Sequence, residues 1–197
     1  MRIGILGGTF DPPHLGHLEF ARAAMENLKL DEVLFLPASR NPLKTMRSSP
    51  AKQRLEMVEA MIKSEPKMAV SDIEISRGGP SYMVETLMEL QMVKPAEFWL
   101  LLGDDALKLF HKWKNPHKVL KLCRLAVALR PPTTELDAMV RLPDEMKEKV
   151  DIVPMKPVDM SATELRDRIM KGPGSVVAPF LSPAVLQYIK ENRLYRS

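Results

Sequence analysis

The sequence has few features that would place the protein outside the cell or in a membrane. Only one cysteine, Cys123, occurs among the 197 residues, so the chain cannot close an intramolecular disulfide. The longest apolar runs, residues 98–102 and 125–129, are far shorter than the roughly 18 residues that a membrane span requires. No long apolar segment with a small-residue cleavage site follows Met1. We therefore expect a cytoplasmic protein without a membrane partner, with Cys123 as a small buried side chain.

The sequence also lacks a block of charge of one sign. Its 29 Lys and Arg residues are spread among 25 Asp and Glu residues, and the net charge is +4. This balance suits an anionic small molecule. The isoelectric point of about 9.2 is the only feature in favour of nucleic-acid binding. Because no basic stripe is interleaved with aromatic residues, we expect no nucleic-acid partner.

Short apolar segments alternate with longer amphipathic segments, which predicts a parallel β-sheet covered by helices. Strands are expected at residues 2–6, 32–36, 68–72, 98–102, 124–129 and 150–153. Helices are expected at residues 15–28, 50–64, 81–93, 105–110, 134–149, 161–170 and 182–191. This order predicts an α/β fold, a Rossmann-like doubly wound parallel sheet with helices on both faces. We expect one domain over residues 1–197, with a C-terminal helical portion from about residue 160 to 197.

The segment after the first strand has the composition of a phosphate site. Residues 7–17 are Gly-Gly-Thr-Phe-Asp-Pro-Pro-His-Leu-Gly-His. Gly7 and Gly8 let a phosphate approach main-chain N–H groups, and the next helix points its positive dipole end into the same space. His14 and His17 lie on one side of the first helical turn, and Gly16 between them leaves room for a nucleotide. Taken alone, a glycine-rich turn with a polar helix cap also suits a purely structural role.

A second candidate phosphate segment lies near the other end of the chain. Ser161 and Glu164 have the spacing of a capping box, which predicts a helix N-terminus. The same helix start offers free N–H groups, the Thr163 hydroxyl and the Arg166 guanidinium to a phosphate chain. Two such segments in one chain are stronger evidence for a phosphate-rich ligand than either segment alone.

Both segments resemble motifs of one family. Residues 7–17 resemble the first motif of the nucleotidyltransferase superfamily with the signature His-x-Gly-His, in the form found in bacterial nicotinate-mononucleotide adenylyltransferases. Residues 161–166 are similar to the Ser-x-Thr-x-x-Arg triphosphate motif of the same superfamily, and the similarity extends over nearly the whole chain. The resemblance implies four catalytic residues, His14, His17, Lys44 and Arg166. It implies ATP-binding residues at Gly7, Gly8, Thr9, Phe10, Gly16, Gly103, Asp105, Ser161 and Thr163.

Two further segments are similar to the family, the first of them with local departures. Residues 37–44 resemble a Pro-Pro-His-Lys loop, in which Lys44 matches while Asn41 and Leu43 replace a proline and a histidine. Residues 103–107 resemble a Gly-x-Asp-x-Leu segment near the ATP site. From the residues alone, Asp104 and Asp105 are better explained as a helix N-cap with a first-turn acid than as a metal pair.

The mononucleotide would lie near Tyr82, Met83 and Trp113. The resemblance places a pyridine-stacking tryptophan at Trp113, and an indole face attracts a flat pyridinium cation. By sequence alone a tryptophan is more often a core residue. Met83 stands where the family has threonine, so only a main-chain N–H remains there for the carboxylate of the pyridine.

The reaction implied by the resemblance is adenylyl transfer from ATP to nicotinate mononucleotide, with Mg²⁺ held mainly by phosphates and water and no metal site made of protein side chains. Several alternatives stay open. The acceptor could be nicotinamide mononucleotide or phosphopantetheine, or the chain could be a non-catalytic nucleotide-binding regulator. The oligomeric state is not readable from the sequence.

Overall fold

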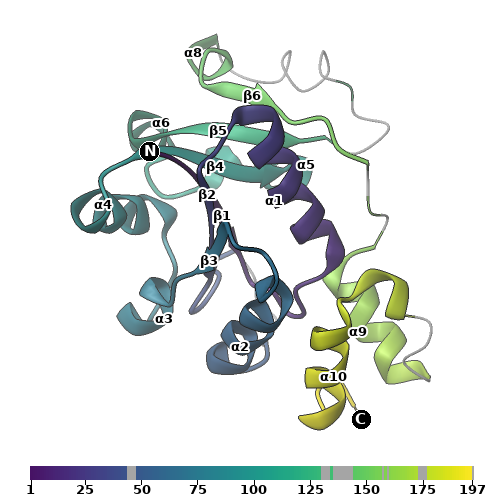
Figure 1. Cartoon of the computed structure of the whole chain (residues 1–197). Helices are drawn as coiled ribbons and strands as arrows, with labels where there is room; N and C mark the ends of the chain where they lie inside the picture. Colours follow the sequence, from purple (N-terminus) through teal and green to yellow (C-terminus); the bar gives the residue numbers. More distant parts are fainter. Residues whose placement is uncertain are drawn as a thin grey trace.

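The computed structural model describes residues 1–43, 48–129, 134, 144–156, 158, 160–172 and 177–196. Six parallel strands form one sheet in the order β3-β2-β1-β4-β5-β6 (Figure 1). The strands are β1 (Arg2–Gly8), β2 (Glu32–Pro37), β3 (Met68–Val70), β4 (Glu97–Gly103), β5 (Cys123–Ala128) and β6 (Val150–Ile152). The predicted α/β fold with a doubly wound parallel sheet is confirmed.

Helices cover both faces of this sheet. On one face pack α1 (Leu15–Leu28), α2 (Ala51–Ile62), α9 (Ala162–Lys171) and α10 (Pro183–Glu191). On the other face pack α4 (Met83–Val93), α5 (Asp104–Lys108), α6 (Pro116–Leu122) and α8 (Asp144–Lys147). The short helix α3 (Ile73–Arg77) precedes α4, and two 3₁₀ turns, η1 (Phe110–Lys112) and η3 (Ala178–Phe180), complete the described helices. None of the helices among the described residues is long and apolar enough to cross a membrane.

The apolar strands explain why the sheet is covered twice. Successive side chains of a strand point to opposite faces, so an uninterrupted apolar strand supplies both cores. In β4, Phe98 and Leu100 belong to the core under α4 and α6, while Trp99 and Leu101 belong to the core under α1. Cys123, at the start of β5, is 6% exposed, and burial raises the pKa of its thiol to about 12. The prediction that Cys123 is a buried structural side chain is confirmed.

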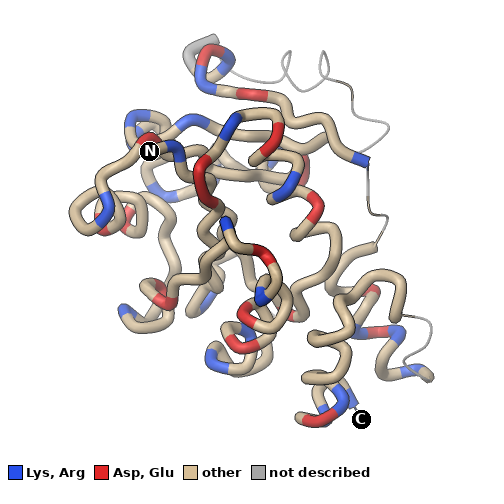
Figure 2. Tube along the Cα trace, viewed as in Figure 1, with Lys and Arg blue, Asp and Glu red and all other residues tan. Residues whose placement is uncertain are grey.

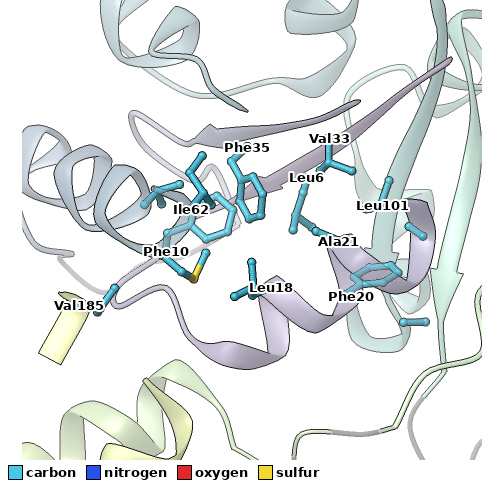
Figure 3. Packing of buried hydrophobic residues seen from close by; sticks show 14 of the residues in the cluster. Leu6, Phe10, Leu18, Phe20, Ala21, Val33, Phe35, Ile62, Leu101 and Val185 are labelled. Atoms are coloured by element: carbon cyan, nitrogen blue, oxygen red, sulfur yellow. The ribbon is translucent and has the colours of Figure 1, made fainter. Parts of the chain in front are cut away.

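The core under α1 also fixes the turn that follows β1. Phe10 of this turn points toward Leu18 of α1 and Phe35 of β2, with Val185 of α10 beside them (Figure 3). Phe10 has φ 51°, a left-handed conformation that costs a phenylalanine roughly 1–2 kcal/mol. Its ring is only 2% exposed, and burying a ring of this size contributes about 1.5–3 kcal/mol. Packing therefore offsets the backbone strain and holds the turn in place.

The structure differs from the predicted elements at three points. Helices α3 and α6 were not predicted, because each is short and the Asn115-Pro116 pair at the start of α6 has the composition of a turn. The predicted helix at 105–110 is two elements, α5 and η1. Of the predicted helix at 134–149, only α8 is an element of the described residues. Acidic and basic residues are interspersed along the described chain, as the sequence indicated (Figure 2).

Candidate active site

Three of the four predicted ATP-binding glycines lie where the strand order of the sheet reverses. β1 pairs with β2 on one side and with β4 on the other, and the chain continues outward in both directions from this pair. Gly7 and Gly8 end β1, and Gly103 ends β4. In open parallel sheets, the crevice at the carboxyl ends of the two strands at such a reversal is where ligands bind. The sheet thus brings these three glycines to one edge.

The two predicted catalytic histidines are in direct contact. His14 is the N-cap of α1, and its backbone N–H donates a hydrogen bond to Nδ1 of His17 at 3.1 Å. Their ring centroids are 3.7 Å apart with an interplanar angle of 32°. Because Nδ1 of His17 accepts a hydrogen bond, the neutral ring carries its proton at Nε2. Nε2 is therefore a donor that can meet an anionic oxygen.

Two neighbours hold these rings in position. The edge of Phe10 contacts His17, with ring centroids 5.0 Å apart and planes at 71°. A Cβ added to Gly16 would lie 3.0 Å from Cε1 and Nδ1 of His14 and 3.3 Å from Cβ of Val158. We expected Gly16 to leave room for a nucleotide, but the space beside it is filled by the imidazole of His14. The absence of a Cβ at Gly16 therefore leaves room for the His14 ring.

The second phosphate motif reaches the first one through Arg166. Ser161 caps α9 and forms the predicted capping box, with Glu164 N–H donating to Ser161 Oγ at 3.2 Å and Ser161 N–H donating to Glu164 Oε2 at 2.8 Å. Arg166 donates from Nη1 to the backbone carbonyl of Asp11 at 2.6 Å, across 155 residues of sequence. Its Nη2 donates to Oγ1 of Thr163 at 3.1 Å. Figure 1 shows α9 beside the start of α1.

A buried arginine that sequence analysis missed joins the loops around this site. Arg54 of α2 is 1% exposed and donates to three backbone carbonyls, those of Thr9 at 2.8 Å, Ser39 at 3.1 Å and Ser49 at 2.9 Å. Burial lowers the pKa of its guanidinium from its usual value. Arg54 thus ties the turn after β1 to the loop after β2. The sequence contained a signal for the burial of Arg54, because this residue lies on the same helix face as the apolar residues Met57, Val58 and Met61, which are buried.

The three predicted mononucleotide residues line one cavity. Tyr82, Met83 and Trp113 surround a space of about 160 Å³ that also contacts Gly7 and Gly8. A Cβ added to Gly7 would lie 2.7 Å from Cε of Met83, so this glycine permits the close approach of the α4 side chain. The cavity therefore opens directly beside the phosphate turn.

Neighbouring side chains contact the aromatic walls of the cavity. Trp113 packs on Phe110, with ring centroids 5.3 Å apart and planes at 47°. Nζ of Lys114 lies 4.3 Å from the centroid of the Tyr82 ring and 2.6 Å from Oε1 of Glu85. The pKa of Lys114 is raised, mainly by its hydrogen bond to Glu85. These contacts hold both rings at the rim of the cavity.

A buried acid that was not predicted lies at the base of the cavity. Glu74 of α3 is 3% exposed and lines the cavity. Its Oε1 accepts a hydrogen bond of 2.7 Å from the hydroxyl of Thr86, which in turn accepts one of 2.9 Å from Nη2 of Arg77. Burial raises the pKa of Glu74, although the hydrogen bonds from Thr86 and Ser81 oppose the shift.

The remaining predicted residues are Asp105, which the structure describes, and Lys44, which it does not. Asp105 is in the first turn of α5, with a side chain 81% exposed. Asp104 is buried and pairs with Lys108. The N-cap of α5 is Gly103, so the N-cap predicted for the aspartates was wrong and the first-turn acids were right. Lys44 lies outside the described residues, as do parts of the loop around it.

The parallel sheet of this order, with a glycine-rich turn at β1 and two phosphate motifs that meet, defines a nucleotide-binding transferase site. Residues 5–168 match the family described as cytidylyltransferase-like. Proteins named "probable nicotinate-nucleotide adenylyltransferase" from Dehalococcoides mccartyi and Herpetosiphon aurantiacus are 38% and 39% identical to the chain. The first alignment covers 99% of this chain and 97% of the relative, and the second covers 98% of each. The chain belongs to the nicotinate-nucleotide adenylyltransferase family.

The fold is shared with a solved structure of much lower sequence similarity. The nicotinic acid mononucleotide adenylyltransferase of Plasmodium falciparum, complexed with NaAD, has a TM-score of 0.79 at 19% identity. The similarity covers 98% of this chain and 97% of that chain. At this identity the comparison shows a shared fold, and the shared part includes the C-terminal helices.

Proposed function

We propose that this protein transfers the adenylyl group of ATP to nicotinate mononucleotide, giving deamido-NAD and pyrophosphate. The observation that carries this proposal is the meeting of the two phosphate motifs, through Arg166 and Asp11, beside the cavity of Tyr82, Met83 and Trp113. The relatives in D. mccartyi and H. aurantiacus carry the name of this activity, and they match the chain over nearly its full length.

The chemistry needs no nucleophilic side chain. An oxygen of the 5′-phosphate of the mononucleotide, already an anion at neutral pH, attacks the α-phosphorus of ATP in line. A new P–O bond forms as the bond between the α-phosphorus and the bridging oxygen breaks, and pyrophosphate leaves with that electron pair. Such transfers depend mainly on positioning and on neutralising the charge that develops.

In this proposal the turn after β1 binds the reacting phosphate. His17 donates from Nε2 to a phosphate oxygen, and His14 lies beside it against the same group. Main-chain N–H groups of Gly7, Gly8 and Thr9 line the site. Phe10 supports His17 through the ring contact described above. Gly103 and Asp105 are assigned to the adenosine part of ATP by their similarity to the Gly-x-Asp-x-Leu segment.

In the same proposal, the second phosphate motif binds the pyrophosphate that leaves. Ser161, Thr163 and Arg166 at the start of α9 would bind the β- and γ-phosphates, and Lys44 would assist from the loop after β2. Arg166 is a bidentate donor, and its contact with Asp11 supports a position between the two motifs. Loss of a donor at this place would weaken the stabilisation of the leaving group.

Mg²⁺ is proposed to enter with ATP. No three His, Cys, Asp or Glu side chains come together as a metal site among the described residues. Bound with a nucleotide, Mg²⁺ commonly takes its ligands from phosphate oxygens and water, and we propose the same arrangement here. When bound, the ion supplies positive charge to the triphosphate. We also propose that the reaction takes place in the cytoplasm.

The mononucleotide would fill the cavity with its pyridine ring on Trp113. The start of α4, where Tyr82 is the N-cap, offers main-chain N–H groups for a carboxylate, which supports the acid form of the pyridine. The side-chain hydroxyl that the family has at Met83 is missing, so the main chain would carry this recognition.

The test is pyrophosphate release from ATP with Mg²⁺, using nicotinate mononucleotide, nicotinamide mononucleotide and phosphopantetheine as separate acceptors. A strong preference for the first is expected. Preference for the second would keep the chemistry and overturn the acid-form assignment. Activity only with phosphopantetheine would replace the acceptor. Folded protein that binds ATP but is silent with all three would contradict the transferase proposal and favour a nucleotide-binding regulator.

A further inference from the structure

The segment that follows α10 contacts the phosphate turn directly. The hydroxyl of Tyr195 donates to Oδ1 of Asp11 at 2.6 Å, although the two residues are 184 positions apart. Arg193 and Tyr195 have φ values of 52° and 58°, in the left-handed region that non-glycine residues rarely adopt. This backbone turns the segment back on the domain instead of extending α10. A conformation with a steric cost persists where other contacts stabilise it.

Asp11 is a junction whose oxygen atoms all receive donors. Oδ1 accepts from Tyr195, Oδ2 accepts from the N–H of Ser49 at 3.1 Å, and the backbone carbonyl accepts from Nη1 of Arg166 at 2.6 Å. Asp11 is only 4% exposed, so water has little access to replace a lost donor. Burial, and next the hydrogen bond to Asp11, raise the pKa of Tyr195, which keeps its hydroxyl protonated as a donor.

We propose that Tyr195 is a positioning residue for the phosphates of ATP, acting through Asp11. Asp11 carries the carbonyl that anchors Arg166, and it lies three residues before His14 in the same turn. Removing the Tyr195 hydroxyl frees one side of the Asp11 carboxylate, so the turn and Arg166 lose their fixed relation. The inference rests on the proposed function in that it assigns the turn and Arg166 to ATP.

A tyrosine that only stabilises the fold would behave differently, and the chain offers a matched control. Tyr188 of α10 also donates its hydroxyl to a carboxylate, that of Glu56 on α2. It therefore shares with Tyr195 the residue type, the kind of partner and the C-terminal part of the chain. Glu56 is on α2 and outside the phosphate turn. Comparing Tyr195→Phe with Tyr188→Phe separates an effect on ATP from the loss of any tyrosine–carboxylate hydrogen bond.

The experiment measures the dissociation constant of ATP by calorimetry in the presence of Mg²⁺, and the KM of each substrate, for the two variants and the unmodified protein. For Tyr195→Phe we expect about a five- to ten-fold rise in the Kd and KM of ATP, with the mononucleotide KM within about two-fold. For Tyr188→Phe we expect the Kd of ATP and the KM of each substrate to stay within about two-fold of the values for the unmodified protein. Unchanged ATP affinity in Tyr195→Phe, an equal rise in both KM values, or the same ATP effect in Tyr188→Phe would overturn the proposal.

A second variant keeps the test decisive if Tyr195→Phe does not fold. Asp11→Asn replaces one acceptor oxygen by an NH2 group, which can meet the Tyr195 hydroxyl only as a donor and without the charge of the carboxylate, so this hydrogen bond weakens and ATP affinity should fall. In a folded double variant, Tyr195→Phe should raise the Kd of ATP little beyond the value for Asp11→Asn alone. Fully additive effects on the free energy of ATP binding would contradict the inference that Tyr195 acts through Asp11. Because ATP binding is measured without acceptor, a protein that binds ATP but makes no deamido-NAD would refute the proposed function and leave the Tyr195 comparison valid.

Discussion

The phosphate turn and the mononucleotide cavity lie side by side but are built differently. The turn after β1 is held by buried polar groups, with Asp11, His14 and Arg54 each no more than 5% exposed. Their partners come from distant parts of the sequence, including Arg166 and Tyr195. In the cavity, by contrast, the side chains proposed to contact the mononucleotide are those of Trp113, Tyr82 and Met83, and a buried acid that lines it, Glu74, is paired with Thr86, close to it in sequence.

This difference follows the chemistry that each region would perform. Charge that develops on a phosphate is stabilised only by donors that are already in place, because reorienting them during the reaction costs free energy. A flat pyridinium ring is recognised largely by an aromatic face, which tolerates small displacements. We therefore expect substitutions in the turn to act on turnover and on ATP. Substitutions in the cavity should act mainly on mononucleotide binding.

The largest effect is expected for His17→Ala. Nε2 of His17 carries the proton of the neutral ring when Nδ1 accepts the hydrogen bond from His14, and it is the donor that we propose for the phosphate. Its loss should lower kcat by about 10²–10⁴-fold, the range for removing one well-placed group at a reacting centre. Pyrophosphate release under saturating substrates measures the effect, and circular dichroism verifies that the variant is folded. His117→Ala, which removes an exposed histidine of α6, is the control. Turnover within a few-fold of the unmodified protein would remove His17 from the centre.

A smaller and more selective effect is expected for Trp113→Ala. The lost stacking surface should raise the mononucleotide KM by about ten-fold, with the ATP KM changed little. Trp113→Phe retains an aromatic face on Phe110 and should give an intermediate value. Steady-state kinetics with each substrate varied in turn measures both constants. If the ATP KM rises instead, Trp113 acts on ATP binding, and the phosphate turn and the cavity are not separate binding regions.

The sequence predicted the elements of the turn better than the contacts that fix it. His14, His17 and the capping box at Ser161 were predictable because their partners are three residues away, within one helical turn. The pairing of Asp11 with Tyr195 depends on how α10 packs, which no local pattern encodes. Arg54 could have been predicted, since a charged residue on the buried face of an amphipathic helix must find acceptors.

The missed helices have a similar explanation. An Asn-Pro pair can begin a helix, with the proline at its first position, or it can form a turn. At α6 the sequence allows both, and tertiary packing selects the helix. Val119 and Leu120 are buried there, against the same core as Phe110. That packing brings η1 and Trp113 to the cavity. The aromatic wall therefore depends on a helix that the sequence pattern did not predict.

The smallest effect is expected for Glu74→Gln, and it concerns stability. Glu74 is the buried acid of the cavity, and burial raises its pKa above the ordinary value of 4.5. Well below that value the carboxyl is protonated in the folded and the unfolded chain, and the variant should differ from the unmodified protein by about 1 kcal/mol at most, from altered hydrogen bonds to Thr86. Urea unfolding at several pH values between about 3 and 8 measures the difference.

The sign of the pH dependence is what tests the burial of Glu74. As pH rises from 4.5 through the raised pKa, the unfolded chain has lost its proton while the folded chain still holds it. The folded state binds more protons in this window, so the stability of the unmodified protein falls relative to Glu74→Gln and then levels off. Glu26→Gln, at an exposed position of α1, is the reference for neutralising any carboxylate. A relative stability that rises with pH would mean that Thr86 and Arg77 stabilise the Glu74 anion more than burial destabilises it.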